Sequence, residues 1–84
     1  MGKYRTEVYW WHGNLDVRVW KADVFISLNT ETDFHCNLSK FLKIFSSCKA
    51  GKWNIYEISA EDLSFLLRNM NVMDSHDFRD HINH

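Results

Sequence analysis

The alternation of apolar and polar residues near the start of the chain predicts a β-hairpin. Residues 6–12 and 15–21 both alternate in this way, and Gly13 and Asn14 lie between them. Glycine adopts a positive φ at no steric cost, so Gly-Asn suits a two-residue turn. With that turn, the opposite pairs are His12 with Leu15, Trp10 with Val17, and Val8 with Val19.

This hairpin has two different faces, because side chains alternate along a strand. The mainly aliphatic face carries Val8, Trp10, Val17 and Val19. The other face carries Glu7, Tyr9, Trp11, Asp16, Arg18 and Trp20. A register slip of one residue would exchange the two faces, so the assignment depends on the turn.

Two further strands are expected. Residues 23–28 form the third, which turns Val24, Ile26 and Leu28 to one side and Phe25 to the other. The turn-forming stretch 29–33 then predicts a loop. Residues 52–58 are β-branched and aromatic almost throughout, which favours a fourth strand.

An amphipathic helix is predicted between the third and fourth strands. Asn37 is a suitable N-cap and Gly51 a suitable end. The apolar residues fall at helical spacing on one stripe, formed by Leu38, Phe41, Leu42, Phe45 and Cys48 and widened by Ile44. Lys40, Lys43 and Ser47 occupy the opposite side.

A second amphipathic helix follows the fourth strand. Ser59, with Asp62 three residues later, forms a variant of the capping box. The apolar face consists of Leu63, Leu66, Leu67 and Met70, and Phe65 falls outside it. Asn71 is expected to end this helix in the left-handed conformation.

The segment 74–84 is expected to form a short third helix that begins at Ser75. Its apolar anchors are Phe78 and Ile82, which could fold back over Phe65. The chain is therefore predicted to be one small α+β domain, residues 1–84, of order β-β-β-α-β-α. Two amphipathic helices pack on one face of a mainly antiparallel sheet, and a short C-terminal helical segment follows. The helices would cover Val8, Trp10, Val17, Val19, Val24, Ile26 and Leu28.

The opposite face of the sheet is then left to solvent. It would present Tyr9, Trp11, Arg18, Trp20 and Phe25. Aromatic residues and arginine are what protein interfaces concentrate, so these five are the predicted partner-binding residues. Three other interpretations stay open. Trp11 and Trp20 could be core residues, or the C-terminal segment could lie across this face. Cross-strand aromatic pairs also stabilise small sheets without any binding role.

Composition narrows the class of partner. The formal net charge is −1, so charge alone favours neither nucleic acid nor a basic surface as the partner. The charge becomes +4 if all five histidines are protonated, so this argument applies near neutral pH. Lys40, Lys43, Lys49 and Lys52, together with the sheet aromatics, nevertheless make nucleic-acid binding the leading alternative. A homodimerising structural protein is the second alternative.

Neither catalysis nor metal binding finds strong support. His76, Asp77, Asp80, His81 and His84 gather near the C-terminus, but no thiolate joins them. Cys36 follows His35, and adjacent side chains in an extended segment point apart. No phosphate loop or nucleophile motif occurs. The expectation is a chain that is not an enzyme and uses no metal or cofactor.

The sequence thus predicts a non-catalytic protein-binding domain, acting as a stoichiometric inhibitor or adaptor on a larger protein or complex. Small inhibitors of host complexes encoded by phages share this size and composition, which is an analogy only. No apolar run suggests a signal peptide or a membrane segment. With only two cysteines, a reducing compartment such as the cytoplasm is expected.

Overall fold

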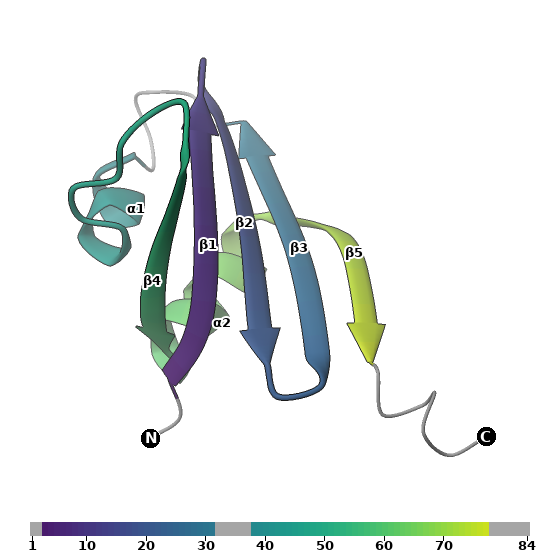
Figure 1. Ribbon diagram of the computed structural model, residues 1–84. Helices are drawn as coiled ribbons and strands as arrows, with labels where there is room; N and C mark the ends of the chain where they lie inside the picture. Colours follow the sequence, from purple (N-terminus) through teal and green to yellow (C-terminus); the bar gives the residue numbers. More distant parts are fainter. Residues whose placement is uncertain (1–2, 32–37, 78–84) are drawn as a thin grey trace.

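The computed structural model describes residues 3–31 and 38–77, without side-chain detail at positions 31 and 38–40. The elements are β1 (Lys3–Trp11), β2 (Asn14–Lys21), β3 (Val24–Glu31), α1 (Leu38–Ile44), β4 (Trp53–Ser59), α2 (Ala60–Asn69) and β5 (Asn71–Asp77). The strands form one antiparallel sheet in the order β4-β1-β2-β3-β5. Helix α2 lies behind this sheet, and α1 lies beside β4 (Figure 1).

The first hairpin turns one position earlier than predicted. His12 and Gly13 both have positive φ, 49° and 80°, and Trp11 pairs with Asn14. Positive φ at both central residues is the type I′ arrangement, whose twist matches that of the flanking strands. Every predicted pair is therefore shifted by two residues: Val8 lies opposite Val17, and Trp10 opposite Leu15. Because the shift is even, the predicted faces of the two strands are unchanged.

The core lies between the sheet and α2. Its fully buried strand residues are Val8, Val17, Val19 and Leu28, as the alternation predicts, and Thr6 is buried with them. From α2 the buried residues are Leu63 and Leu66, and Met70, directly after the helix, is buried with them. The predicted cap is also confirmed, since the Ser59 hydroxyl accepts a hydrogen bond from the Asp62 amide at 3.2 Å.

The predicted apolar stripes of the two helices need correction at one residue each. Leu42 in α1 is 41% exposed and Leu67 in α2 is 40% exposed, so neither belongs to the core. Phe65, which the helical spacing places outside the apolar face of α2, is half-buried. Its ring meets that of Phe41 from α1 at 5.6 Å, edge to face. The short helix therefore covers Phe65, a role that the sequence pattern assigns to Phe78 and Ile82, which lie outside the described residues.

Helix α1 is shorter than predicted. It ends at Ile44, and Ser47 takes the left-handed conformation with φ 61°. Phe41 and Phe45 are buried, and the Phe45 ring lies 5.3 Å from that of Tyr56 in β4. Gly51 does not end the helix; its amide donates to the Trp10 carbonyl at 2.8 Å, so it belongs to the start of the β4 pairing.

The segment that follows α2 is a strand, which overturns two expectations. Met70 ends the helix in an extended conformation, and Asn71 opens β5 instead of a left-handed cap. Residues 74–77 pair with β3, so the predicted third helix is wrong for this part. Residues 78–84 lie outside the described residues. The described residues thus form a small α+β domain with a five-stranded sheet, one main helix and one short helix.

Candidate functional site

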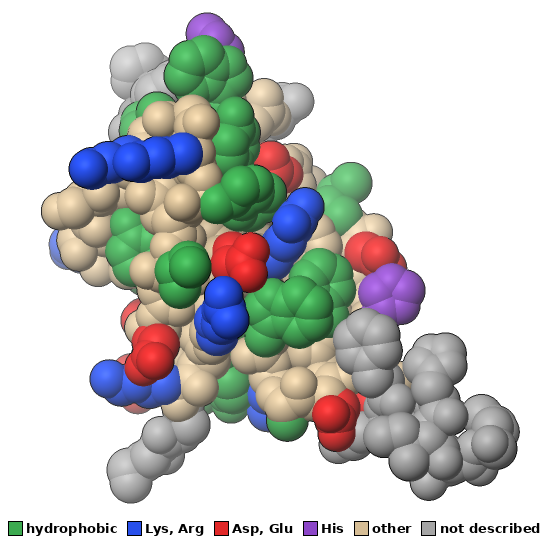
Figure 2. Space-filling view, in the orientation of Figure 1, with side chains coloured by type: hydrophobic (Ala, Val, Ile, Leu, Met, Phe, Trp, Pro, Cys, Tyr) green, Lys and Arg blue, Asp and Glu red, His purple; other side chains and the backbone are tan. Residues whose placement is uncertain are grey.

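The sheet has one face that is not covered by α2, here called the open face. Figure 2 views it directly, with apolar side chains interleaved with charged ones. Strand pairing sets its side chains in rows that cross the sheet from β4 to β5. The upper row is Trp53, Tyr9, Asp16, Asn29 and Asn71; the middle row is Ile55, Glu7, Arg18, Ser27 and Asp74; the lower row is Glu57, Arg5, Trp20, Phe25 and His76.

Two of the predicted binding residues, Tyr9 and Arg18, both contact Trp53, which the sequence pattern did not single out. The rings of Tyr9 and Trp53 lie 5.4 Å apart and are tilted by 44°. The guanidinium carbon of Arg18 lies 4.3 Å from the centroid of the Trp53 ring. This is cation–π geometry, and it holds the indole in place on the open face.

A second aromatic pair lies across the face from the first. Trp20 and Phe25 occupy opposite positions on β2 and β3, and their rings are 4.4 Å apart. The His76 ring from β5 stacks beside Phe25 at 6.3 Å, and its Nε2 lies 2.9 Å from an Asp74 carboxylate oxygen. Trp20 keeps 38% of its surface exposed, which leaves it available to a partner.

Trp11, the fifth predicted residue, lies apart from these two pairs at the tip of the hairpin. It is 49% exposed, and its ring meets the His12 ring edge to face at 4.4 Å. Gly51 lies directly under the ring: a Cβ built there would come within 3.1 Å of it. An aromatic side chain that covers a glycine across the strands stabilises sheets by itself, so Trp11 has a structural role.

Polar groups separate the aromatic pairs. Glu7 and Arg18 stand opposite each other on β1 and β2, and Arg5 approaches Glu7 at 3.8 Å. Asp16 accepts a 2.6 Å hydrogen bond from the Asn29 side chain. The three rows together carry the cations Arg5 and Arg18 against the four carboxylates of Glu7, Asp16, Glu57 and Asp74. Lys3, two residues before Arg5 on β1, adds a third cation to the same face. The open face is therefore mixed in charge, with four carboxylates against three cations.

Sequence reasoning missed Trp53, Ile55 and His76. Along β4, Trp53 and Ile55 point away from the face on which Ile58 is buried. The alternation of side chains along the strand therefore indicates their orientation. What it lacked was the place of β4 beside β1, because that pairing joins residues about 50 positions apart. Ile55 is 64% exposed and flanks Glu7 on the open face. The sequence pattern assigns His76 to a helix, whereas the residue lies on β5.

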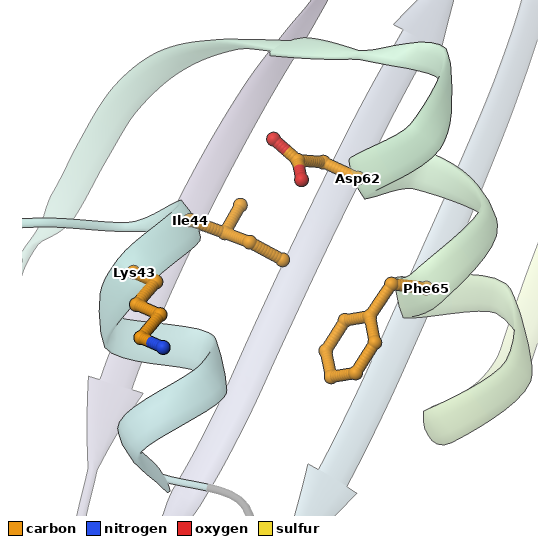
Figure 3. A pocket seen from close by; sticks show the side chains of 4 residues that line it. All are labelled: Lys43, Ile44, Asp62 and Phe65. Atoms are coloured by element: carbon orange, nitrogen blue, oxygen red, sulfur yellow. The ribbon is translucent and has the colours of Figure 1, made fainter.

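The lysines of the nucleic-acid alternative lie elsewhere. Lys43 lines a shallow groove between α1 and α2, together with Ile44, Asp62 and Phe65 (Figure 3). Lys49 and Lys52 belong to the segment that precedes β4. The side chain of Lys40 lies outside the described detail. None of the three placed lysines belongs to the rows of the open face.

Cys48 lies in a polar setting beside the core. The Asn54 side chain donates hydrogen bonds to its Sγ at 3.4 Å and to the Lys49 and Lys52 carbonyls. Burial raises the pKa of the Cys48 thiol, and its interaction with Tyr56 lowers that pKa by less. A thiol held protonated is a poor nucleophile, so this environment does not activate it.

Within residues 3–31 and 38–77, no three His, Cys, Asp or Glu side chains are grouped closely enough to hold a metal ion. Asp80, His81 and His84 of the C-terminal cluster, and His35 with Cys36, lie outside them. None of the described helices has the length and apolarity needed to cross a membrane. No family model, curated protein or solved structure matches the chain.

Proposed function

We propose that this chain is a non-catalytic protein-binding domain whose open face contacts a larger protein or complex. The observation that carries the proposal is the pair of aromatic clusters on one sheet face, Tyr9 with Trp53 and Trp20 with Phe25, in each of which the tryptophan is exposed. Large aromatic side chains in a partly apolar patch, with arginine among them, are characteristic of interface hot spots.

Electrostatics favour protein over nucleic acid as the partner. A single strand that stacked its bases on these rings would bring phosphates close to the face. Four carboxylates stand in the rows against Arg5 and Arg18, with Lys3 next on the same face of β1, and Lys43, Lys49 and Lys52 are not among the residues of the rows. Repulsion from the carboxylates would therefore oppose the phosphate contacts that dominate nucleic-acid affinity.

The mode of action that fits such a domain is occupation of a partner's surface, as an inhibitor or adaptor in the cytoplasm. The rings on the open face are already packed against one another, so little side-chain entropy is lost when a partner covers them. A preorganised patch of this kind suits tight one-to-one binding.

The proposal is tested by affinity capture with three variants. Trp20→Ala and Trp53→Ala each remove one ring from the open face, and Leu67→Ala removes an equally exposed apolar side chain from α2. We expect the first two to lose a protein that wild type and Leu67→Ala retain, with little change between low and high salt. Loss of capture after nuclease treatment or at high salt would favour the nucleic-acid alternative instead.

A further inference from the structure

We infer that β5 is a detachable edge strand, which separates from β3 while the other four strands and both helices stay folded. The inference concerns the fold itself, and only its consequence for the open face rests on the proposed function. β5 lies at one edge of the sheet and, among the described strands, pairs with β3 alone (Figure 1). Its place in the sheet therefore depends on one row of backbone contacts and on the packing of its own side chains.

The side chains of β5 contribute little to the core. Residues 71–76 are all exposed, and none of the buried hydrophobic residues in the described part of the chain belongs to β5. Val72 lies opposite buried Leu28 but keeps 53% of its surface exposed, and Met73 keeps 65%. Because the burial of apolar area is the main stabilising term, separation of β5 costs little of the hydrophobic stabilisation of the domain.

The pairing of β5 with β3 is also interrupted. Asp74 lies opposite Ser27 and Val72 lies opposite Leu28, so Met73 has no counterpart on β3. Such a bulge disrupts the ladder of backbone hydrogen bonds locally. The backbone contacts that hold β5 are therefore divided into two short stretches.

The edge strand on the other side of the sheet, β4, is anchored differently. Ile58 is buried in the core, and the Tyr56 ring lies 5.3 Å from that of Phe45. β4 also runs directly into α2, which covers the sheet. Separation of β4 would open the core, so this strand is the matched control for β5.

The separation has a defined hinge. Met70 is buried, and its amide donates a hydrogen bond to the Leu66 carbonyl at 2.9 Å. The chain is therefore fixed to the end of α2 up to this residue, and movement of the strand begins at Asn71.

Separation of β5 changes the open face. In the closed sheet the His76 ring stacks beside Phe25, with 6.3 Å between ring centres, and Asp74 supplies a carboxylate to the middle row. When β5 separates, it carries both of these side chains away. A partner of the open face then meets a more accessible Phe25 ring and one carboxylate fewer.

The test is amide hydrogen exchange of the wild-type chain, followed by NMR at increasing urea concentrations below the unfolding transition. After correction for intrinsic rates, amides in the β3–β5 pairing should exchange at least about a hundredfold faster than those in the β4–β1 pairing, because local opening needs less free energy than global unfolding. Their rates should depend only weakly on urea, since little surface is exposed. Equal protection and equal urea dependence in the two pairings would overturn the inference.

A cross-strand disulfide provides a second measurement. Ser27 and Asp74 lie opposite each other, and the ~4.5–5.5 Å between opposed Cα atoms is within the range that a disulfide spans. Ser27→Cys with Asp74→Cys is made in a Cys36→Ser, Cys48→Ser background, and circular dichroism checks the fold. Oxidation should slow exchange in the β3–β5 pairing at least about tenfold, and by more than in the β4–β1 pairing, with the reduced protein as control. Equal rates in the two forms would contradict the detachable strand.

Both measurements use the free protein, so they are independent of capture by a partner. The proposed function fails separately, when neither Trp20 nor Trp53 matters for capture.

Discussion

The guanidinium carbon of Arg18 lies 4.3 Å from the centre of the Trp53 ring, although β1 separates the strands that carry them. The arginine therefore reaches across a whole strand, because β1 lies between β2 and β4 in the sheet. The contact ties β4, at one edge of the sheet, to the centre of the open face. It also fixes one of the two rings on which the proposed binding depends.

This contact has a measurable energy. A double-mutant cycle with Arg18→Met and Trp53→Leu should give a coupling of about 0.5–1 kcal/mol in the free energy of unfolding, the range for an exposed cation–π pair. Arg5→Met serves as the control, because it removes a cation of the same face whose guanidinium approaches the Glu7 carboxylate at 3.8 Å. Equal coupling of Arg5 and Arg18 to Trp53 in urea titrations would contradict the account.

Gly51 is expected to be sensitive to alanine. Its φ of +79° disfavours any side chain, and an added Cβ would come within 3.1 Å of the Trp11 ring. Gly51→Ala should therefore lower the free energy of unfolding by about 1–2 kcal/mol from backbone strain alone. In a Trp11→Ala background the loss should be smaller, since the ring no longer crowds the new methyl group. An unchanged loss would mean that the ring contact is unimportant.

Adjacent leucines on α2 provide a matched test of the core. Leu66 is fully buried, whereas Leu67 is 40% exposed. Leu66→Ala should cost about 2–5 kcal/mol through lost burial and the cavity that remains. Leu67→Ala should cost less than about 1 kcal/mol, as an exposed substitution does. Similar urea midpoints for the two variants would show that α2 is rotated from the position described.

Cys48 should react slowly as a nucleophile. Burial raises its pKa above the ordinary 9.0, so less thiolate is present at pH 8 than in an unfolded chain. The folded state holds this proton more tightly; its contribution to stability is therefore complete at neutral pH and is lost as the pH rises through the folded pKa. In a Cys36→Ser variant, alkylation by iodoacetamide should be slower in buffer than in urea at the same pH. Equal rates would contradict the raised pKa.

Local patterns predicted the parts of the fold that depend on neighbouring residues. Alternation placed Val8, Val17 and Val19 in the core, and the capping pattern located Ser59 at the start of α2. The predicted faces of β1 and β2 are correct despite the error in the turn, because the true register differs from the predicted one by two residues. That error came from placing Gly13 first in the turn, whereas His12 tolerates the first positive φ.

The sequence pattern did not predict the pairing of strands that lie far apart in the sequence. Val72, Met73 and the polar residues that follow carry no strand signal, and β5 forms because the outer edge of β3 offers unpaired backbone groups. In the same way, Trp53 and Ile55 join the open face only through the pairing of β4 with β1. The candidate site was therefore predicted in its central strands and missed at its edges.

The central claim, that the open face is where this chain meets another protein, is tested most directly by site-specific photo-cross-linking. A benzophenone amino acid placed at Ile55, which is 64% exposed on the open face, is compared with the same group at Leu67 on α2. We expect a cross-linked protein of defined mass from position 55 and none from position 67, with loss of the product in a Trp20→Glu background. Equal products from both positions, or a product only from position 67, would contradict the account.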